Sequence, residues 1–262
     1  MNKAHNRGYQ GAIFDVDGVL VASPHERAWR DTLRRLFDTE WSDILSQTSY
    51  APERYTTAVY QEHVSGKPRM SGAVAALRYF GVPEAAERAK RYAECKQEQL
   101  IELINAGEFT SFSDGVRFML AMKEMGLHLG VASSSKNADV FLQQLRPDTS
   151  SGSYRTVTAQ TTLLDMFEAN VCGRDFKEGK PHPEIFQTAA KELNLSTDVC
   201  FVVEDATSGI QAAKAGGMAA LGVARLDDEA LLLEAGGDLV VTSLDDVALD
   251  ALAKGRLRKR GA

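Results

Sequence analysis

The sequence predicts an α/β fold: a doubly wound parallel sheet with helices on both faces, interrupted by an all-helical domain. Short apolar runs bounded by turn residues recur along the chain and alternate with amphipathic stretches, which is typical of a parallel sheet buried on both faces. Residues 23–106 read as helical throughout. We therefore expect a core domain of residues 1–22 and 107–262 and an inserted cap domain of residues 23–106.

The expected strands are continuous apolar runs, and three of them end in reactive polar residues. Asp15 follows the first run, Ser133 the second, and Glu204-Asp205 the third. In sheets of this type ligands bind beyond the carboxyl ends of the strands, so these residues predict a site at that edge. The five runs are Gly11–Phe14, Leu127–Ala132, Val199–Val203, Ala219–Val223 and Asp238–Val241.

Helix signals separate these runs. Residues 208–215 predict a helix that Gly216-Gly217 closes. Pro183 suits the first turn of a helix that ends near Asn194, because its missing N–H has no partner to lose there. In the cap domain we expect four helices, at 26–37, 53–64, 72–79 and 83–105.

Composition limits the classes of function. A chain of 262 residues with a net charge of −6 argues against a general nucleic-acid binder, which usually has a basic face. The first eight residues lack the apolar stretch of a signal peptide, and no apolar run approaches the roughly 20 residues that span a bilayer. The three cysteines lie far apart and predict reduced packing residues. We expect a cytoplasmic monomer or homodimer that binds neither nucleic acid nor membrane.

The stretch Asp15-Val16-Asp17-Gly18 places two carboxylates directly after a buried strand. A turn that begins at Val16 would aim them differently, so that one could attack phosphorus while the other handles a proton. Gly18 supplies the backbone freedom of such a turn. Asp and Gly are also common in ordinary loops after strands, so this motif alone leaves both interpretations open.

Three further segments favour the chemical interpretation. Ser133-Ser134-Ser135-Lys136-Asn137 offers hydroxyls and the N–H groups of a helix start, which can cradle a phosphate, although Ser135 could equally be a simple helix cap. Lys180, followed by a proline, can hold a fixed positive charge against a phosphoryl group. Glu204-Asp205 supplies the hard oxygen ligands that Mg²⁺ prefers.

In order and spacing, Asp15-Val16-Asp17-Gly18, Ser133, Lys180 and Glu204-Asp205 resemble the four motifs of the haloacid dehalogenase superfamily of phosphatases and phosphomutases. The resemblance covers nearly the whole chain and implies a Rossmann-like core. The helical insert after the first motif resembles the cap of the subgroup that contains β-phosphoglucomutase. The segments 132–137 and 203–210 are similar to that subgroup as well.

The resemblance implies a role for each motif. Asp15 would attack phosphorus and form an aspartyl-phosphate, and Asp17 would act as general acid and base. Mg²⁺ would be held by Asp15, Glu204, Asp205 and the backbone carbonyl of Asp17. Ser133 and Lys180 would hold the transferring phosphoryl oxygens, and Mg²⁺ with Lys180 would keep Asp15 ionised.

Substrate choice is expected to lie in the cap. Arg69, in Gly66-Lys67-Pro68-Arg69, matches a cap arginine that binds the non-transferring phosphate, and Lys96 matches a second cap cation. His25 matches a histidine that follows the first motif, although the connection to it is two residues shorter here and contains Pro24. Solvated surface charges are the alternative interpretation of Arg69 and Lys96.

The expected function is phosphate release from a small phosphorylated metabolite, such as a sugar phosphate. The main alternative is a β-phosphoglucomutase-type isomerase: the two cap cations favour it, whereas the shortened connection before His25 favours the phosphatase. A dehalogenase would have no use for Asp17 and the metal carboxylates. A non-catalytic module on the same fold would normally lack one of the four motif residues Asp15, Asp17, Lys180 or Asp205, all of which are present.

Overall fold

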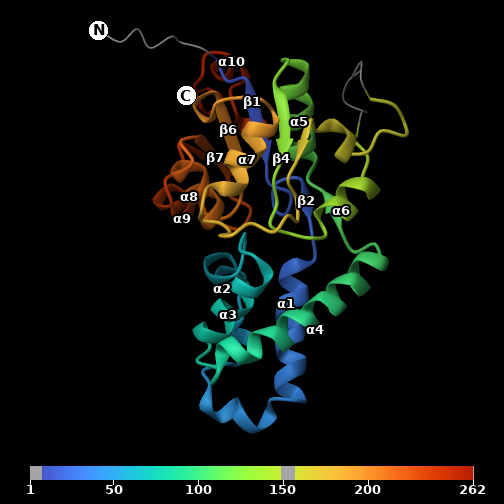
Figure 1. Ribbon diagram of the computed structural model, residues 1–262, viewed down its shortest axis with the longest axis vertical. Helices are drawn as coiled ribbons and strands as arrows, with labels where there is room; N and C mark the ends of the chain where they lie inside the picture. The colour runs from blue at the N-terminus through green and yellow to red at the C-terminus, as the bar shows by residue number, and fades with distance from the viewer. Residues whose placement is uncertain (1–7, 149–156, 262) are drawn as a thin grey trace. The chain divides into compact units, whose positions relative to one another are not determined.

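The computed structural model describes residues 8–148 and 157–261, and the chain divides into two compact units. Unit 1 contains Met1–Ala22 and Ser111–Ala262, and unit 2 contains Ser23–Thr110 (Figure 1). The chain returns to unit 1 at Ser111, after a turn in which Gly107 has a φ of 72°.

Unit 1 is built on a six-stranded parallel sheet with the strand order β5-β4-β1-β6-β7-β8. The parallel sheet and five of its strands were predicted from the sequence. β1 lies in the middle and pairs with β4 on one side and with β6 on the other. The strands are β1 (Gly11–Phe14), β4 (His128–Val131), β5 (Ala169–Asn170), β6 (Cys200–Glu204), β7 (Ala219–Val223) and β8 (Leu239–Val241).

Alternate side chains of β1 point to opposite faces of the sheet, and both faces are buried. Phe14 packs edge-on against Phe118 of α5 (Ser113–Glu124). Ile13 belongs instead to the apolar cluster formed by α7 (Glu184–Glu192) and α8 (Thr207–Ala215). This double burial explains why the strand reads as a continuous apolar run.

The remaining helices of unit 1 are short. They are α6 (Ala138–Gln144), α9 (Glu229–Glu234) and α10 (Leu249–Leu252), with 3-10 turns η3 (Leu164–Met166), η4 (Thr197–Val199) and η5 (Leu244–Asp246). α8 begins and ends within one residue of the prediction. α7 begins directly after Pro183, as predicted, and ends at Glu192.

Unit 2 is helical and has its own core, to which several aromatic side chains contribute. Trp29 and Tyr92 meet edge-on with ring centroids 4.8 Å apart, and the Tyr92 hydroxyl donates to the Trp29 carbonyl. The elements of unit 2 are α1 (His25–Asp38), η1 (Ser42–Gln47), η2 (Pro52–Arg54), α2 (Thr57–His63), α3 (Arg69–Tyr79) and α4 (Ala85–Asn105).

The expected helix at 53–64 is too long by one turn. Its first residues form η2, and α2 begins only after Thr56, whose hydroxyl accepts from the Val59 N–H at 3.3 Å. A threonine that caps a helix keeps an extended backbone, so it interrupts the apolar periodicity that suggested one continuous helix. A short 3-10 turn, η1, was also not predicted.

Three strands of two residues each escaped the sequence analysis. These are β5 of the main sheet and the pair β2 (Val21–Ala22) and β3 (Thr110–Ser111), which form a second small sheet. β5 follows the connection 146–162, of which residues 149–156 lie outside the described part. The two residues that flank this connection are hydrogen-bonded, because the Leu163 N–H donates to the Leu145 carbonyl at 3.0 Å. Within the described residues, none of the helices has both the length and the apolar character that a membrane crossing requires.

Candidate active site

The predicted motifs meet at the topological switch point of the sheet. From β1 the chain moves outward to β4 and β5, and then it crosses back to add β6, β7 and β8 on the other side. The carboxyl ends of β1 and β6 lie side by side where these two directions diverge, which is where ligands bind in open parallel sheets. Asp15 directly follows β1, and Glu204 is the last residue of β6.

Lys180 joins these two strand ends. Its Nζ donates to Asp15 Oδ1 and to Glu204 Oε1, both at 2.5 Å. All three side chains are buried, and the aliphatic arm of Lys180 brings Nζ to 4.8 Å from the centroid of the Phe186 ring. The lysine, which the sequence predicted as a site residue, reaches this position from the loop before α7.

Charge in this cluster is not balanced. Burial lowers the pKa of Lys180, but the Asp15 and Glu204 carboxylates outweigh it, so the pKa lies above its usual value and the side chain stays cationic. Burial raises the pKa of Asp15, against the lowering effect of Lys180. Burial and the neighbouring carboxylates Glu204, Asp15 and Asp17 raise the pKa of Asp205 well above its usual range. Several acidic groups thus crowd around one buried cation.

Both oxygens of the Glu204 carboxylate have hydrogen-bond partners. Its Oε2 accepts from the N–H groups of Asp205 and Ala206 at 3.0 and 2.9 Å, while Oε1 faces Lys180. Gly209, in the first turns of α8, leaves room for this carboxylate, because a Cβ there would lie 1.8 Å from Oε1. Glu204 therefore positions Lys180 and the start of α8.

The segment after Asp15 folds into a tight loop. The N–H groups of Leu20 and Val21 both donate to the Val16 carbonyl, at 2.9 and 2.8 Å, and Val16 N–H donates to Asp15 Oδ2 at 2.6 Å. Gly18 has a φ of 79°, and a Cβ on it would lie 1.9 Å from Asp205 Oδ2. Only glycine fits both requirements, which explains the residue type at this position.

The donor set fits a divalent cation in charge and in ligand type. Asp15 and Asp205 supply carboxylate oxygens, and burial together with neighbouring carboxylates raises the pKa of both groups. Among the described residues, however, no three acidic, histidine or cysteine side chains are grouped as a ready-made metal site. Asp205 also lies against the loop after Asp15, because a Cβ on Gly18 would lie 1.9 Å from its Oδ2, so Asp15 and Asp205 are candidates for hard-oxygen coordination of Mg²⁺.

Ser133 lies at the end of the neighbouring strand, as predicted. It is buried, and its hydroxyl accepts from the Ser135 N–H at 3.1 Å, while the Ser135 hydroxyl accepts from the Asn137 N–H at 3.2 Å. α6 begins only at Ala138, so Ser134 and Lys136 belong to the turn before the helix. Lys136 is exposed and pairs with Asp175 at 2.7 Å, away from the buried carboxylates.

Two of the three expected cap residues, His25 and Lys96, are in contact in unit 2. His25 is the first residue of α1, and its Nδ1 lies 2.7 Å from Lys96 Nζ on α4. Burial, Lys96 and Arg69 hold the pKa of His25 well below its usual range, which favours the neutral ring. Arg69 is half-buried at the start of α3. Lys96 itself is buried, 5.0 Å from the centroid of the Trp29 ring, and is not a solvated charge.

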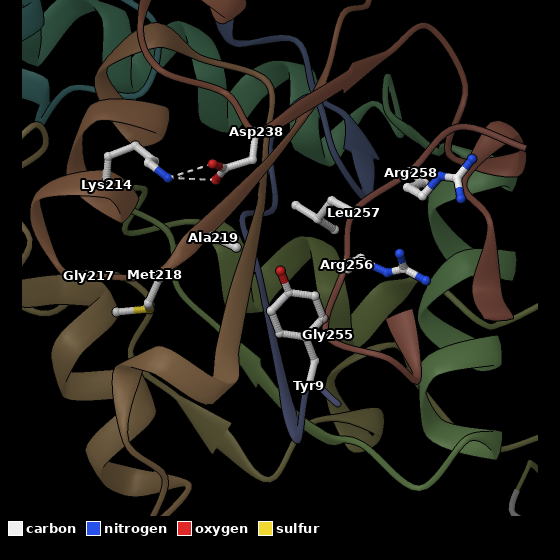
Figure 2. A pocket seen from close by; sticks show the side chains of 10 residues that line it. All are labelled: Tyr9, Lys214, Gly217, Met218, Ala219, Asp238, Gly255, Arg256, Leu257 and Arg258. Atoms are coloured by element: carbon white, nitrogen blue, oxygen red, sulfur yellow. Dashed lines mark hydrogen bonds and ion pairs between the residues drawn. The ribbon is translucent and has the colours of Figure 1, made fainter. Parts of the chain in front are cut away.

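A separate pocket of about 490 Å³ opens at the opposite edge of the sheet (Figure 2). Tyr9, which precedes β1, and Asp238, which precedes β8, mark it as the amino-terminal edge. Lys214 and Asp238 neutralise each other there at 2.7 Å. The pocket contains none of the motif residues, so it is distinct from the candidate active site.

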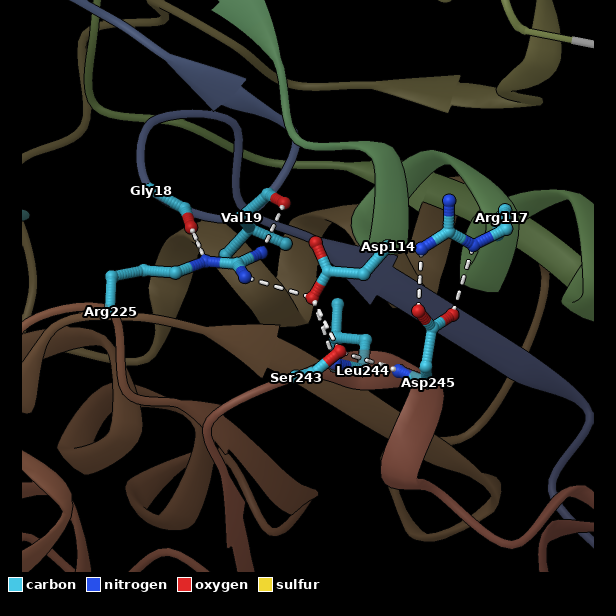
Figure 3. Close-up of polar contacts among 8 residues, drawn as sticks. All are labelled: Gly18, Val19, Asp114, Arg117, Arg225, Ser243, Leu244 and Asp245. Carbon is cyan, nitrogen blue, oxygen red and sulfur yellow. Dashed lines mark hydrogen bonds and ion pairs between the residues drawn. The ribbon is translucent and has the colours of Figure 1, made fainter.

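The sequence analysis missed Arg225 and Asp114. Arg225 follows β7 at the same edge of the sheet and donates to the backbone of the loop after Asp15 (Figure 3). The rule that selected Asp15, Ser133 and Glu204, a polar residue at the end of an apolar run, also selects Arg225, which stands two residues after Ala219–Val223. Asp114 carries no such signal, because it lies in the first turn of a helix, where acidic residues are common.

Comparison with known proteins agrees with these motifs. The family model of the haloacid dehalogenase-like hydrolases matches residues 9–217. A β-phosphoglucomutase of Mycobacterium bovis is 30% identical over 258 residues, which cover 91% of each chain. A phosphorylated carbohydrates phosphatase of Thermotoga maritima is 28% identical, covering 88% of this chain and 94% of the relative.

Solved structures give the same answer. An archaeal β-phosphoglucomutase from a Pyrococcus strain superposes with a TM-score of 0.66 at 30% identity, covering 92% of this chain and 96% of the other. The family model, the relatives and the parallel sheet with its motifs at the switch point agree. The chain belongs to the haloacid dehalogenase-like hydrolases, in the subgroup that contains β-phosphoglucomutase.

Proposed function

We propose that this enzyme transfers a phosphoryl group of a phosphorylated sugar through Asp15 and returns it to a sugar hydroxyl, as a β-phosphoglucomutase-type isomerase. The observation that supports phosphoryl transfer most strongly is the buried bridge from Lys180 to Asp15 and Glu204 at the switch point. A carboxylate that attacks an anionic phosphate needs positive charge beside it, and Lys180 supplies that charge to the nucleophile itself.

Each residue has one role in the proposed reaction. Asp15 Oδ attacks phosphorus, so that the bond to the sugar oxygen breaks and an aspartyl-phosphate forms. Asp17 donates a proton to the departing oxygen and later takes one from the hydroxyl that attacks the aspartyl-phosphate. Ser133 and Lys180 hold phosphoryl oxygens.

Mg²⁺ would be held by Asp15, Asp205 and the backbone carbonyl of Asp17, with Glu204 beside them holding Lys180. When bound, the ion would offset the charge of the carboxylates and of the phosphoryl oxygens. The pKa values of Asp15 and Asp205 support this proposal, because burial and neighbouring carboxylates raise them, and a bound cation would favour the ionised forms.

The choice of isomerase over phosphatase rests on unit 2. The shortened connection before His25 was the argument for a phosphatase, yet His25 begins α1 and contacts Lys96 at 2.7 Å. Pro24 thus directly precedes α1, and His25 remains in contact with Lys96. Lys96, with the nearby positive charge of Arg69, supplies the cationic group that a second, non-transferring phosphate requires. The phosphatase remains the second candidate, supported by the relative from Thermotoga maritima.

The decisive assay follows both reactions in one sample. We expect β-glucose 1-phosphate, with Mg²⁺ and a catalytic amount of a glucose bisphosphate, to be converted to glucose 6-phosphate faster than inorganic phosphate appears. A panel of other sugar phosphates tests the phosphatase in parallel. Phosphate release that exceeds isomerisation for every substrate would reject the isomerase and leave the phosphatase.

A further inference from the structure

Arg225 makes a convergent set of contacts at the carboxyl edge of unit 1 (Figure 3). Its Nε donates to the Gly18 carbonyl at 2.9 Å, and its Nη2 donates to the Val19 carbonyl at 3.3 Å. Its Nη1 donates to Asp114 Oδ2 at 2.8 Å. The guanidinium carbon lies 4.0 Å from the centroid of the Phe112 ring. One side chain thus binds the loop after the nucleophile to the segment that begins α5.

Asp114, the carboxylate that binds Arg225, has further hydrogen-bond partners. Asp114 Oδ2 also accepts from the Leu244 N–H at 2.9 Å and from the Ser243 hydroxyl at 3.3 Å. The side chains of Arg225 and Asp114 are only 12% and 10% exposed, so solvent screens their contact little. Phe112 fixes a further part of the loop, because its N–H donates to the Leu20 carbonyl at 2.9 Å.

The loop has little room to adapt if these contacts are lost. On one side Gly18 packs against the Asp205 carboxylate, and on the other Gly115 packs against Val19, where a Cβ would lie 2.3 Å from the carbonyl oxygen. Within the turn, the Val16 and Val21 carbonyls accept the hydrogen bonds, whereas the Gly18 and Val19 carbonyls accept from Arg225. Arg225 is therefore the group that holds these two carbonyls in their direction.

We propose that Arg225 is a positioning residue for phosphoryl transfer: with Asp114 as its anchor, it fixes the Gly18 and Val19 carbonyls and thereby sets where Asp15 and Asp17 point. This inference rests on the proposed function of the Asp15 site. A planar guanidinium suits the task, because its donors lie in a rigid fork and can bind two carbonyls and a carboxylate at once. A lysine keeps the charge but not this fork.

Arg117 offers a matched control on the same helix as Asp114. It forms a two-pronged contact with Asp245, with Nε to Oδ1 at 3.0 Å and Nη2 to Oδ2 at 2.5 Å, next to Ser243 (Figure 3). This pair is more exposed, at 41% and 46%. Arg117 and Arg225 are thus both paired with an aspartate in the same region. The side-chain hydrogen bonds of Arg225 reach the loop after Asp15, whereas those of Arg117 go to Asp245.

The experiment compares Arg225→Met, Arg225→Lys and Arg117→Met in the full chain with Mg²⁺. Steady-state assays on β-glucose 1-phosphate and on p-nitrophenyl phosphate give kcat and KM separately. Amide hydrogen exchange measured by NMR at Leu20 and Val21 reports the loop without any reaction. In Arg225→Met we expect kcat to fall about 10- to 100-fold with KM nearly unchanged, and these amides to exchange about tenfold faster or more.

The control should change neither quantity, and Arg225→Lys should give an intermediate loss. If Arg225→Met does not fold, the lysine variant serves for both measurements. Unchanged kcat and unchanged exchange at Leu20 and Val21, with only a lower melting temperature, would overturn the proposal and leave Arg225 a purely structural residue. If the wild-type chain transfers phosphate from no substrate but Arg225→Met still frees these amides, the proposed function fails while the hold of Arg225 on the loop stands.

Discussion

Lys180 is the residue on which the electrostatics of unit 1 depend. It stands between Asp15 and Glu204 with all three side chains buried. A buried charge is tolerated only with partners, and removal of one member leaves the others uncompensated. The proposed function and the stability of unit 1 therefore depend on the same residues, and substitutions must be designed to separate the two.

The first prediction isolates the nucleophile. Asp15→Asn replaces one carboxylate oxygen by an amide group of nearly the same size, and the amide cannot attack phosphorus. Turnover should disappear on every substrate that the wild-type chain accepts, while the circular dichroism spectrum stays unchanged. Activity above a few per cent of wild type in rigorously purified variant would contradict covalent transfer through Asp15.

The second prediction concerns stability. Lys180→Met keeps most of the side-chain volume but leaves the Asp15 and Glu204 carboxylates facing each other without a cation. We expect a loss of about 3–5 kcal/mol in the free energy of unfolding, measured in urea without added metal. The double variant Lys180→Met/Glu204→Gln removes one of the stranded charges and should recover part of that loss. Additive effects of the two substitutions would mean that they are not coupled.

Among the elements of the fold, α8 is shaped most closely by the site. Its first turns carry Gly209, although alanine is the better helix former by up to about 1 kcal/mol. The reason is the Glu204 carboxylate, which occupies the space of a Cβ at this position. The glycine is thus explained by the side chain that it faces and not by a need for unusual backbone angles.

The third prediction follows from this contact. Gly209→Ala should destabilise the protein by about 1–3 kcal/mol, the usual cost of overpacking, and should lower activity by displacing Glu204 from Lys180. Gly216→Ala at the end of the same helix is the control, since a Cβ there meets its nearest atoms, Met218 Cε and Pro183 Cβ, at 3.2 Å. Urea unfolding and kcat of both variants provide the test. Equal stability in the two variants would mean that the helix shifts to make room.

The elements also show what a sequence can reveal. Long apolar runs such as 199–203 mark central strands, because burial on both faces leaves an unmistakable pattern. β5 has two residues, too few for any periodicity, and it is specified by its pairing with β4. The site residues that end long strands were predicted for the same reason. The contact of Lys180 with Glu204 and the partners of Arg225 could not be predicted, because they depend on which strand ends become neighbours in the sheet.

At the scale of the whole molecule, two compact units have separate cores and separate clusters of charge. Unit 1 holds Asp15 and Lys180, and unit 2 holds His25 and Lys96. In the proposed function the first cluster performs chemistry and the second recognises the remainder of the substrate. Chemistry and substrate choice should therefore respond to different substitutions.

The fourth prediction tests this division. Arg69→Ala should impair a phospho-sugar substrate by about tenfold or more, since a charge-assisted bond to a phosphate is lost. It should spare p-nitrophenyl phosphate, a small ester that needs only the residues of unit 1. The ratio of kcat/KM on the two substrates is the measurement. Equal losses would assign Arg69 to the integrity of unit 2, and no loss on either substrate would remove it from the substrate-binding residues.

The central place of β1 has a consequence for how the protein is made. Synthesis produces β1 first, but its two partners in the sheet, β4 and β6, follow only after all of unit 2 and, for β6, much of unit 1. Until then the buried side chains of Ala12, Ile13 and Phe14 have no sheet to join. The nascent chain thus carries an apolar strand without sheet partners until β4 and then β6 have been made, and an unpaired apolar strand is prone to aggregation.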